Sequence, residues 1–599
     1  MKGARFTLVF SLATTLTLPL SAQSSQTGAS LGTNTIDDDR PVPDLVGLVN
    51  RTESELASVV QRYANDRAAL GRRWDVPNSP DRRDRLRQFY ERWTSSLNDV
   101  DFDGLSLEGK IDFVLMQNEL SYELESLQRE EELFRQMAPL IPFAETLIEL
   151  REQRRRMEIP DPQATAAILA ELPDRITEAR QSVEASLDGA DPPSRIVAFR
   201  AASALGTMRR GMTQWYRYYA GYDPFFTWWN RDPYETLDEA INDYIQFLRS
   251  KVVGIVAGEE EPIVGDPIGV AGLESDLAHE MIPYTPEELI AIGEREFAWL
   301  DQEMLAASRD LGYGEDWMAA LEHVKNLAVE PGKQTEVVRE LAQEAINFIK
   351  QRDLVTVPPL AEEIWRMEMM SPERQRVSPF FLGGEVILVS YPTDDMTHDE
   401  KLMSMRGNNP YFSRATVHHE LIPGHHLQGF MTSRYNSHRR VFNTPFWGEG
   451  WALYWEMLLW DLGFPQKPEE RIGMLFWRMH RAARIIFSLS FHLGRMTPDE
   501  AIDFLVDRVG HERANATAEV RRSFNGSYPP LYQAAYMLGG MQIRALRQEL
   551  VASGRMTDRE FHDAILQGGR MPIEMLRARL HGVAPQRNFE TAWRFADSR

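Results

Sequence analysis

Four of the thirteen histidines in this 599-residue chain fall within nine residues, in the segment HHELIPGHH from His418 to His426. Imidazole is the commonest neutral nitrogen ligand for zinc, and an open zinc site without thiolates typically uses two histidines and one carboxylate. The chain contains no cysteine, so histidine, aspartate or glutamate must hold any such metal. Two histidine pairs that flank a glutamate therefore predict a metal site in this segment.

The spacing of these histidines departs from His-Glu-x-x-His, in which a four-residue step places two imidazoles on one helix face. His425 follows His419 by six residues, and because a regular helix turns about 100° per residue, the two rings would lie on different faces. Pro423 cannot donate a hydrogen bond within a helix, and Gly424 tolerates unusual torsions. We therefore predict that Leu421–Gly424 form a bulged turn within the helix, which absorbs two extra residues and returns His425 to the metal.

His426 is the competing second ligand. It follows His419 by seven residues and would share its helix face without distortion. Seven residues of helix rise about 10 Å, however, which is near the limit at which two imidazoles can share one ion. We favour His425, and we expect His418 and the unused member of the second pair to contact the ligands or the substrate.

A third ligand must come from another segment, and FWGEGWALYWE, from Phe446 to Glu456, is an amphipathic helix with a carboxylate near its start. Glu449 lies between two glycines, and the missing side-chain bulk lets another helix approach closely. A glutamate in a first helical turn can also serve only the helix dipole. Because of the upstream histidines, we predict that Glu449 is the third ligand, with Glu456 as the alternative.

These segments resemble two known groups of proteins. WGEGWALYWE is similar to the Asn-Glu-Gly-Phe-Ala segment of gluzincin peptidases, in which a glutamate on a second helix completes a zinc site of two histidines and one glutamate. Taken in order, HHELIPGHHLQ, WGEGWALYWE, PLYQAAYMLGGMQIRALRQE and FHDAILQGGRMPIEML resemble the bacterial domain of unknown function 885 family over most of the mature chain. That family is grouped by similarity with helical zinc metallopeptidases of the thimet oligopeptidase and carboxypeptidase Taq types.

The resemblance implies one zinc ion with three ligands, namely His419, His425 and Glu449. It implies that Glu420 is the general base and that Tyr532 and Tyr536 face the transition state, as on the tyrosine-bearing helix of thimet-type enzymes. A tyrosine pair at a four-residue step is otherwise ordinary core packing. The chain departs from the peptidase pattern at the two-residue expansion before His425.

The expected chemistry is hydrolysis of amide bonds in short peptides. Zinc lowers the pKa of its bound water and polarises the scissile carbonyl, while Glu420 takes the water's proton and returns it to the leaving amine. The same ligand set also suits a non-peptidase amide hydrolase or an iron oxygenase. A third alternative is a catalytically silent binding protein that retains zinc for structure, although such a site gains nothing from a carboxylate beside its first ligand.

The elements that position these residues are predicted to be helices. Apolar residues recur at three- and four-residue steps from Leu48 to Tyr63 and from Phe113 to Leu124. A further helix is predicted over Thr165–Leu187, divided or kinked at Pro173. The predicted fold class is therefore mainly α. The resemblance implies a large metallopeptidase-like arrangement of two halves around a channel, with a small β-sheet near the active site.

Three segments interrupt this helical pattern. GGEVILVSYP, from Gly383 to Pro392, predicts a strand, either a small structural sheet or an edge on which a peptide substrate adds its backbone hydrogen bonds. WYRYYAGYDPFFTWWN, from Trp215 to Asn230, concentrates aromatic residues, and we favour a buried packing cluster over the lining of a substrate cleft. The Gly- and Pro-rich residues 254–272 predict a surface connection or a boundary between two halves.

The first residues predict export. A short basic start and an apolar run from Phe6 to Leu20 have the layout of a secretory signal peptide over residues 1–22. A disordered leader is predicted over 23–44 and a helical metallohydrolase domain over 45–599. No other stretch reaches about 18 uninterrupted apolar residues, so we expect a periplasmic or secreted protein without stable membrane insertion. No cysteine is present for a lipoprotein anchor.

The charge balance excludes some partners. The chain carries 66 basic and 89 acidic residues, a net charge of -23. Phosphate binding needs clustered positive charge, so we expect no nucleic-acid partner and no attraction to anionic membranes.

Overall fold

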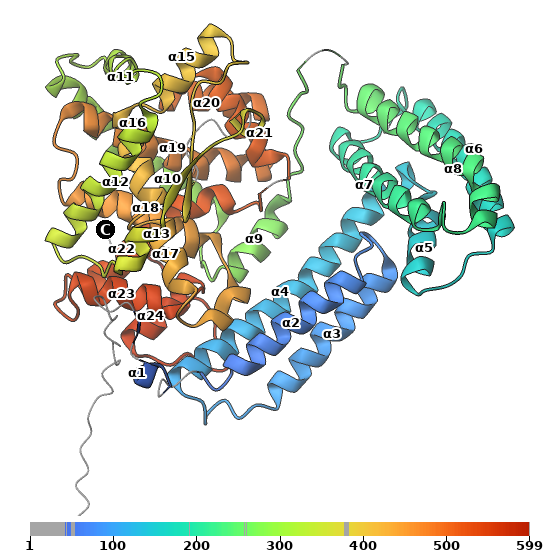
Figure 1. Ribbon diagram of the computed structural model, residues 1–599, viewed down its shortest axis with the longest axis horizontal. Helices are drawn as coiled ribbons and strands as arrows, with labels where there is room; N and C mark the ends of the chain where they lie inside the picture. The colour runs from blue at the N-terminus through green and yellow to red at the C-terminus, as the bar shows by residue number, and fades with distance from the viewer. Residues whose placement is uncertain are drawn as a thin grey trace, which may run out of the picture.

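The computed structural model describes residues 42–43, 45–49, 54–190, 192–256, 258, 260–375, 383–526 and 528–597. The predicted signal peptide, residues 1–22, lies outside the described residues, as does nearly all of the predicted leader, residues 23–44. The fold is mainly α-helical, as predicted (Figure 1). Within the described part of the chain, no helix combines the length and apolar character that crossing a membrane requires.

The first half of the chain forms a helical arm and a lobe that project from the main body (Figure 1). The arm follows the short helix α1 (Leu45–Val49) and consists of α2 (Ala57–Arg73), α3 (Pro80–Asn98) and α4 (Leu107–Met137). The lobe consists of η1 (Ala138–Leu140), α5 (Ala144–Arg155), α6 (Pro162–Ser186), α7 (Arg195–Tyr219), α8 (Pro224–Phe247) and η2 (Leu248–Val252). The lobe has a hydrophobic core of its own, which includes Trp215, Phe226 and Tyr244.

The main body contains the remaining elements. Its helices are α9 (Gly269–His279), α10 (Pro286–Asp310), α11 (Trp317–Lys325), α12 (Gln334–Gln351), α13 (Pro359–Ile364), α14 (Pro372–Gln375), α15 (His398–Gly407), α16 (Pro410–Glu420), α17 (His425–Thr432), η3 (Ser437–Phe442), α18 (Pro445–Asp461), α19 (Pro468–His492), α20 (Pro498–Val509), α21 (Arg513–Phe524), α22 (Tyr532–Leu550), α23 (Asp558–Gly568) and α24 (Ile573–His581). Most of their buried apolar residues form one core with those of the arm.

The predicted helix from Phe113 to Leu124 is confirmed, but the one predicted from Leu48 to Tyr63 is interrupted, because residues 54–56 lie between α1 and α2. Val59 and Tyr63 lie in α2, and the run from Phe113 to Leu124 lies in α4. Of the two alternatives predicted for Pro173, the division is wrong, because α6 continues through this proline, and the kink stays a prediction. Proline costs a helix one hydrogen bond, but buried side chains on both sides of it, such as Leu172 and Ile176, pack in the lobe core.

The predicted strand is present as part of a two-stranded parallel sheet. β1 (Arg366–Met369) pairs with β2 (Val386–Val389), in a register that places Arg366 beside Val386. Ile387 and Val389 are buried in a small cluster with Val338 of α12 and Val417 of α16. The sheet therefore packs directly against the helix that carries the first histidine pair.

The aromatic segment of residues 215–230 is divided between the core and the surface. Trp215 and Phe226 are buried and pack edge to face, which agrees with the packing interpretation. Tyr222, Phe225 and Trp228 are instead 85%, 72% and 82% exposed, so the packing interpretation is wrong for them. The periodicity of apolar residues does not predict this exposure. Tyr222 lies in the tight turn between α7 and α8, and Phe225 and Trp228 lie in the first turns of α8. The last element of the lobe, η2, ends at Val252 and α9 begins at Gly269, so the connection to the main body overlaps the predicted boundary.

Candidate metal centre

The two histidine pairs lie on two helices. α16 ends at Glu420 and α17 begins at His425. Leu421 (φ -104°, ψ -110°) and Gly424 (φ -75°, ψ -133°) have torsions far from helical ones, and the peptide bond before Pro423 is cis. The prediction of a bulge within one continuous helix is therefore wrong, since the chain leaves one helix and starts another.

Glycine is required at the end of this turn. The Gly424 amide donates to the carbonyl of His418 at 3.0 Å, which folds the turn back onto the last residues of α16. A Cβ at Gly424 would lie 1.8 Å from the carbonyl oxygen of His419. Any other residue would therefore push the start of α17 away from the end of α16.

α18 holds the turn from the other side. The Trp451 indole donates to the carbonyl of Pro423 at 2.9 Å, and the Gln428 amide donates to the carbonyl of Trp447 at 3.0 Å. The start of α18 is fixed by Thr444, whose hydroxyl accepts a hydrogen bond from the Phe446 amide at 3.1 Å. The turn and the first turns of α18, which carry Glu449, are thus connected directly.

α18 also packs tightly on α22, the helix of the predicted tyrosines. A Cβ at Gly450 would lie 2.6 Å from backbone atoms of Gly539, and one at Gly539 would lie 2.2 Å from the carbonyl oxygen of Phe446. The predicted close approach of another helix at the glycines around Glu449 is confirmed at Gly450. It sets the backbone of α22 against α18 beside Glu449.

The predicted ligands converge. One potential ligand atom from each of His419, His425 and Glu449 lies within 4.8 Å of the other two. Glu449 Oε2 lies 3.1 Å from His425 Nε2 and 3.7 Å from His419 Nε2. Zinc bonds of about 2.0–2.2 Å in a tetrahedron separate ligand atoms by about 3.3–3.6 Å, so this donor set fits a zinc ion after small shifts.

The other two histidines of the segment point elsewhere. His426 Nε2 lies 2.6 Å from the carbonyl oxygen of Ala361, and the ring is buried. His418 Nδ1 lies 2.7 Å from the carbonyl oxygen of Arg414, and burial lowers the pKa of His418 to about 4. Neither joins the three converging groups, so the geometry favours His425 over His426 as second ligand.

Glu456, the alternative ligand, lies behind His419. Its Oε1 is 2.7 Å from His419 Nδ1, which leaves Nε2 directed at Glu449. Arg481 Nη2 lies 3.7 Å from the same Glu456 oxygen. A carboxylate on the outer nitrogen of a ligating histidine fixes the ring and raises its basicity. The geometry therefore gives Glu456 a positioning role.

The electrostatics of the cluster favour a bound cation. Burial lowers the pKa of His419, but hydrogen bonds to Glu449 and Glu456 outweigh it and raise this pKa to about 9. Burial works against ionisation of Glu449, yet the charges of His425 and His419 hold its pKa well below the ordinary value. Of these two contacts, the one between His419 Nε2 and Glu449 lies where a divalent ion would be bound.

Two of the three predicted catalytic side chains, Tyr532 and Tyr536, contact the cluster. The Tyr532 hydroxyl donates to Glu449, and the Tyr536 ring lies parallel to His419, with centroids 6.1 Å apart. Burial, together with the charge of Glu449, raises the pKa of both tyrosines, so both remain neutral hydrogen-bond donors. Glu420 is partly exposed, next to His419, and its Oε2 would lie 2.7 Å from a Cβ at Gly383.

Sequence reasoning missed the arginines of α19. Arg481 and Arg484 are buried, and both guanidinium groups lie over the Tyr536 ring, at 4.7 and 4.5 Å from its centroid. Arg484 also donates to Glu519 at 2.7 Å. The sequence does show arginines at three-residue steps on an otherwise apolar helix. This spacing does not indicate which neighbouring helix the arginines face.

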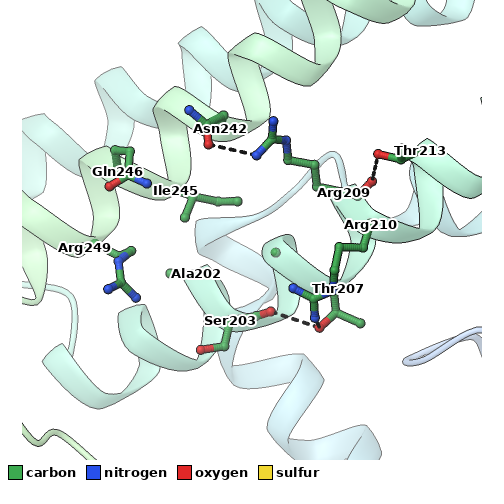
Figure 2. Close-up of a pocket in the computed structure, with 11 residues that line it drawn as sticks. Ala202, Ser203, Thr207, Arg209, Arg210, Thr213, Asn242, Ile245, Gln246 and Arg249 are labelled. Atoms are coloured by element: carbon green, nitrogen blue, oxygen red, sulfur yellow. Dashed lines mark hydrogen bonds between the residues drawn. The ribbon is translucent and has the colours of Figure 1, made fainter. Parts of the chain in front are cut away.

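A polar hollow of about 760 Å³ lies in the lobe, between α7 and α8 (Figure 2). Arg209 there makes two hydrogen bonds to Asp238 and a third to Asn242, and Arg249 pairs with Glu261 at 2.9 Å. Because these lining arginines are neutralised by acidic neighbours, we assign the hollow no ligand.

Comparisons with known proteins agree with the fold and name no activity. A structure from Shewanella oneidensis, described as "a putative lipoprotein of unknown function", is 18% identical, with a TM-score of 0.65 over 88% of this chain and 100% of that chain. A "putative lipoprotein" from Colwellia psychrerythraea is 16% identical, with a TM-score of 0.53 over 88% and 98%. No curated protein matches the chain. A family model described as bacterial protein of unknown function (DUF885) matches residues 62–580, and the chain therefore belongs to this family.

Proposed function

We propose that this protein is a zinc-dependent hydrolase that cleaves amide bonds of short peptides. The observation that carries the proposal is the convergence of His419, His425 and Glu449 from three helices, with Glu420 directly after the first ligand. Zinc bound there would polarise a carbonyl and acidify a coordinated water. Glu420 would accept the proton of that water and return it to the leaving amine.

The surrounding side chains support hydrolysis over a purely structural site. Structural zinc sites are closed by four protein ligands, whereas three groups converge here among the described residues. The His425 side chain is 23% exposed and Glu449 12%, so the cluster has an open side. The neutral hydroxyl of Tyr536 could donate to an oxyanion there, and that of Tyr532 could do so if it released Glu449.

The sheet supports a peptide as substrate. The chain enters β2 through Gly383, whose backbone lies against Glu420. A strand beside a catalytic group offers backbone hydrogen bonds to an extended peptide, independent of its sequence. The resemblance to gluzincin peptidases points to the same substrate class, and the lipoprotein descriptions of the two similar structures favour an exported location.

The test is digestion of a synthetic peptide library by the zinc-loaded protein, read by mass spectrometry. The wild type should cleave amide bonds, a chelator should stop cleavage, and Glu420→Gln should lose about 100-fold or more of the rate while it keeps its zinc. Glu274→Gln, at an exposed glutamate of α9, is the matched control and should retain activity.

Three results would contradict the proposal. The zinc-loaded wild type could cleave no library member, Glu420→Gln could turn over at the wild-type rate, or metal analysis of protein purified without added ions could find iron. If the wild type cleaves nothing, a binding protein is the remaining interpretation. Wild-type turnover by Glu420→Gln would exclude Glu420 as the general base, and bound iron would favour an oxygenase.

A further inference from the structure

The end of the lobe carries seven large apolar side chains on its surface. They come from two loops, residues 156–161 between α5 and α6 and residues 220–223 between α7 and α8, with their flanking helical turns. These residues, which we call the apolar tip, are Met157 (85% exposed), Ile159 (92%), Tyr218 (57%), Tyr222 (85%), Phe225 (72%), Trp228 (82%) and Trp229 (43%).

The two loops lie side by side. The Arg154 guanidinium, at the end of α5, lies over the Tyr218 ring at 4.3 Å from its centroid. The Asn230 side chain of α8 donates to the carbonyl of Pro162, at the start of α6, at 3.1 Å. The seven apolar residues therefore share one end of the lobe.

The backbone beneath the tip is held firmly. The Asp223 carboxylate accepts hydrogen bonds from the amides of Phe225 and Phe226 at 2.9 and 3.0 Å, and the Gly221 amide donates to Thr227 at 2.9 Å. Phe226 is fully buried against Trp215. The aromatic side chains at the surface are thus presented by a defined helical hairpin.

Exposure on this scale indicates a partner. Large contiguous apolar patches are uncommon on monomeric soluble proteins and mark contact with another protein or with a membrane. Side chains that line a groove are half-covered by its walls, whereas five of these seven are at least 72% exposed. The tip is a projection, which suits entry into a soft phase better than contact with a flat protein surface.

Composition and charge distinguish among partners. Tryptophan and tyrosine combine an apolar ring with a polar group and concentrate where lipid meets water. Residues 154–161 and 217–232 contain five arginines and four acidic residues, although the whole chain carries a charge of -23. The tip is therefore free of the strong negative charge that would keep the rest of the surface from a lipid headgroup layer.

We propose that the apolar tip docks the protein on the surface of a lipid bilayer, with its aromatic side chains among the headgroups and upper acyl chains. This interfacial contact requires no membrane-spanning helix. It leaves the main body and its candidate metal centre in the aqueous phase, and it is independent of the proposed hydrolase activity. Because the contact is apolar, it is expected to change little with salt.

The test is co-sedimentation of the chain from residue 23 onward, without the predicted signal peptide, with phosphatidylcholine vesicles and with vesicles that also contain phosphatidylglycerol, at low and high salt. The wild type should sediment with both. The variant Phe225→Ser/Trp228→Ser should lose about tenfold or more of the partition coefficient, because two exposed rings are removed. Leu402→Ser/Val583→Ser removes exposed apolar side chains of the main body and should bind like the wild type.

The thermal unfolding and zinc content of the variants report whether each remains folded. Absence of sedimentation by the wild type, or equal sedimentation by the tip variant, would overturn the proposal. So would binding that needs the anionic lipid and disappears at high salt. Light scattering is the further check: a wild-type dimer that the tip variant converts to a monomer would assign the tip to a second copy of the chain.

Discussion

At the residue scale, Glu456 determines which nitrogen of His419 faces the cluster. Its carboxylate engages Nδ1 at 2.7 Å, and Nε2 then points toward Glu449. Both groups are buried, so water competes little for this contact. The sequence marked Glu456 as a weaker ligand candidate, seven residues after Glu449. Spacing alone cannot separate a ligand from its supporting carboxylate, because that difference depends on which side of the imidazole each reaches.

Replacement of Glu456 by glutamine is expected to weaken zinc binding about 10- to 100-fold, since the outer partner of a metal-ligating histidine has effects of this size. Chelator competition measures the affinity. Asp461→Asn, at an exposed position of the same helix, is the control and should bind zinc like the wild type. An unchanged affinity in Glu456→Gln would show that Glu456 does not position His419.

The stability of the metal-free protein is expected to fall as pH rises through about 9. The pKa of His419 is raised from 6.5 to about 9 in the folded state, so folding favours the protonated ring. That contribution is complete below pH 6.5 and is lost above pH 9. Denaturant unfolding at several pH values measures it. His419→Asn should show a smaller loss over this window, and an equal loss in both proteins would exclude His419 as the cause.

At the element scale, the position of Glu449 depends on contact between α18 and α22. Gly450→Ala is expected to destabilise the fold by about 1–3 kcal/mol, because its methyl group would overlap the backbone of Gly539. Gly448→Ala is the matched control on the other side of Glu449, where no neighbouring heavy atom lies within 4 Å of the new Cβ. It should be neutral or stabilise the helix by up to about 1 kcal/mol.

Urea unfolding of the two alanine variants, together with their zinc affinity, checks this expectation. Gly450→Ala is expected to lose both stability and zinc affinity, and Gly448→Ala is expected to lose neither. Equal behaviour of the two variants would mean that helix contact at Gly450 does not place the ligand.

The turn between α16 and α17 illustrates what local sequence can predict about an element. Pro423 and Gly424 predicted an interruption of the helix, and the structure has it at these residues. Whether the chain re-enters the same helix is not a local property, since Trp451 and Gln428 hold the turn through hydrogen bonds with residues more than eighteen positions away. The choice of His425 was reasoned from a bulge, yet the two-helix turn brings the same histidine to Glu449.

At the scale of the whole molecule, the lobe and the main body have separate hydrophobic cores. Helix content and the strand could be predicted, because both rest on short-range patterns. The projection of the lobe could not, since it depends on which helices share a core. The exposure of Trp228 could not be predicted either, because a cluster of aromatic residues in a sequence looks the same whether it lies in a core or at a surface.

The separate cores predict that the lobe can be weakened without harm to the metal centre. Leu205→Ala, in the lobe core, should destabilise the protein by about 2–5 kcal/mol and leave zinc affinity unchanged. Leu453→Ala, an equally buried leucine of α18, should reduce both stability and zinc affinity. Calorimetry and zinc titration of the pair measure this, and a loss of zinc affinity in Leu205→Ala would show that the two parts are coupled.

The most direct test of the candidate metal centre is the zinc content of three proteins, measured by mass spectrometry of the native chains after dialysis. The wild type should hold one zinc ion per chain, His426→Gln should hold the same, and His425→Gln should lose it. Glutamine at 426 can still donate to Ala361, so the fold is expected to persist. A wild type without zinc, or zinc lost from His426→Gln and kept by His425→Gln, would contradict the proposed centre.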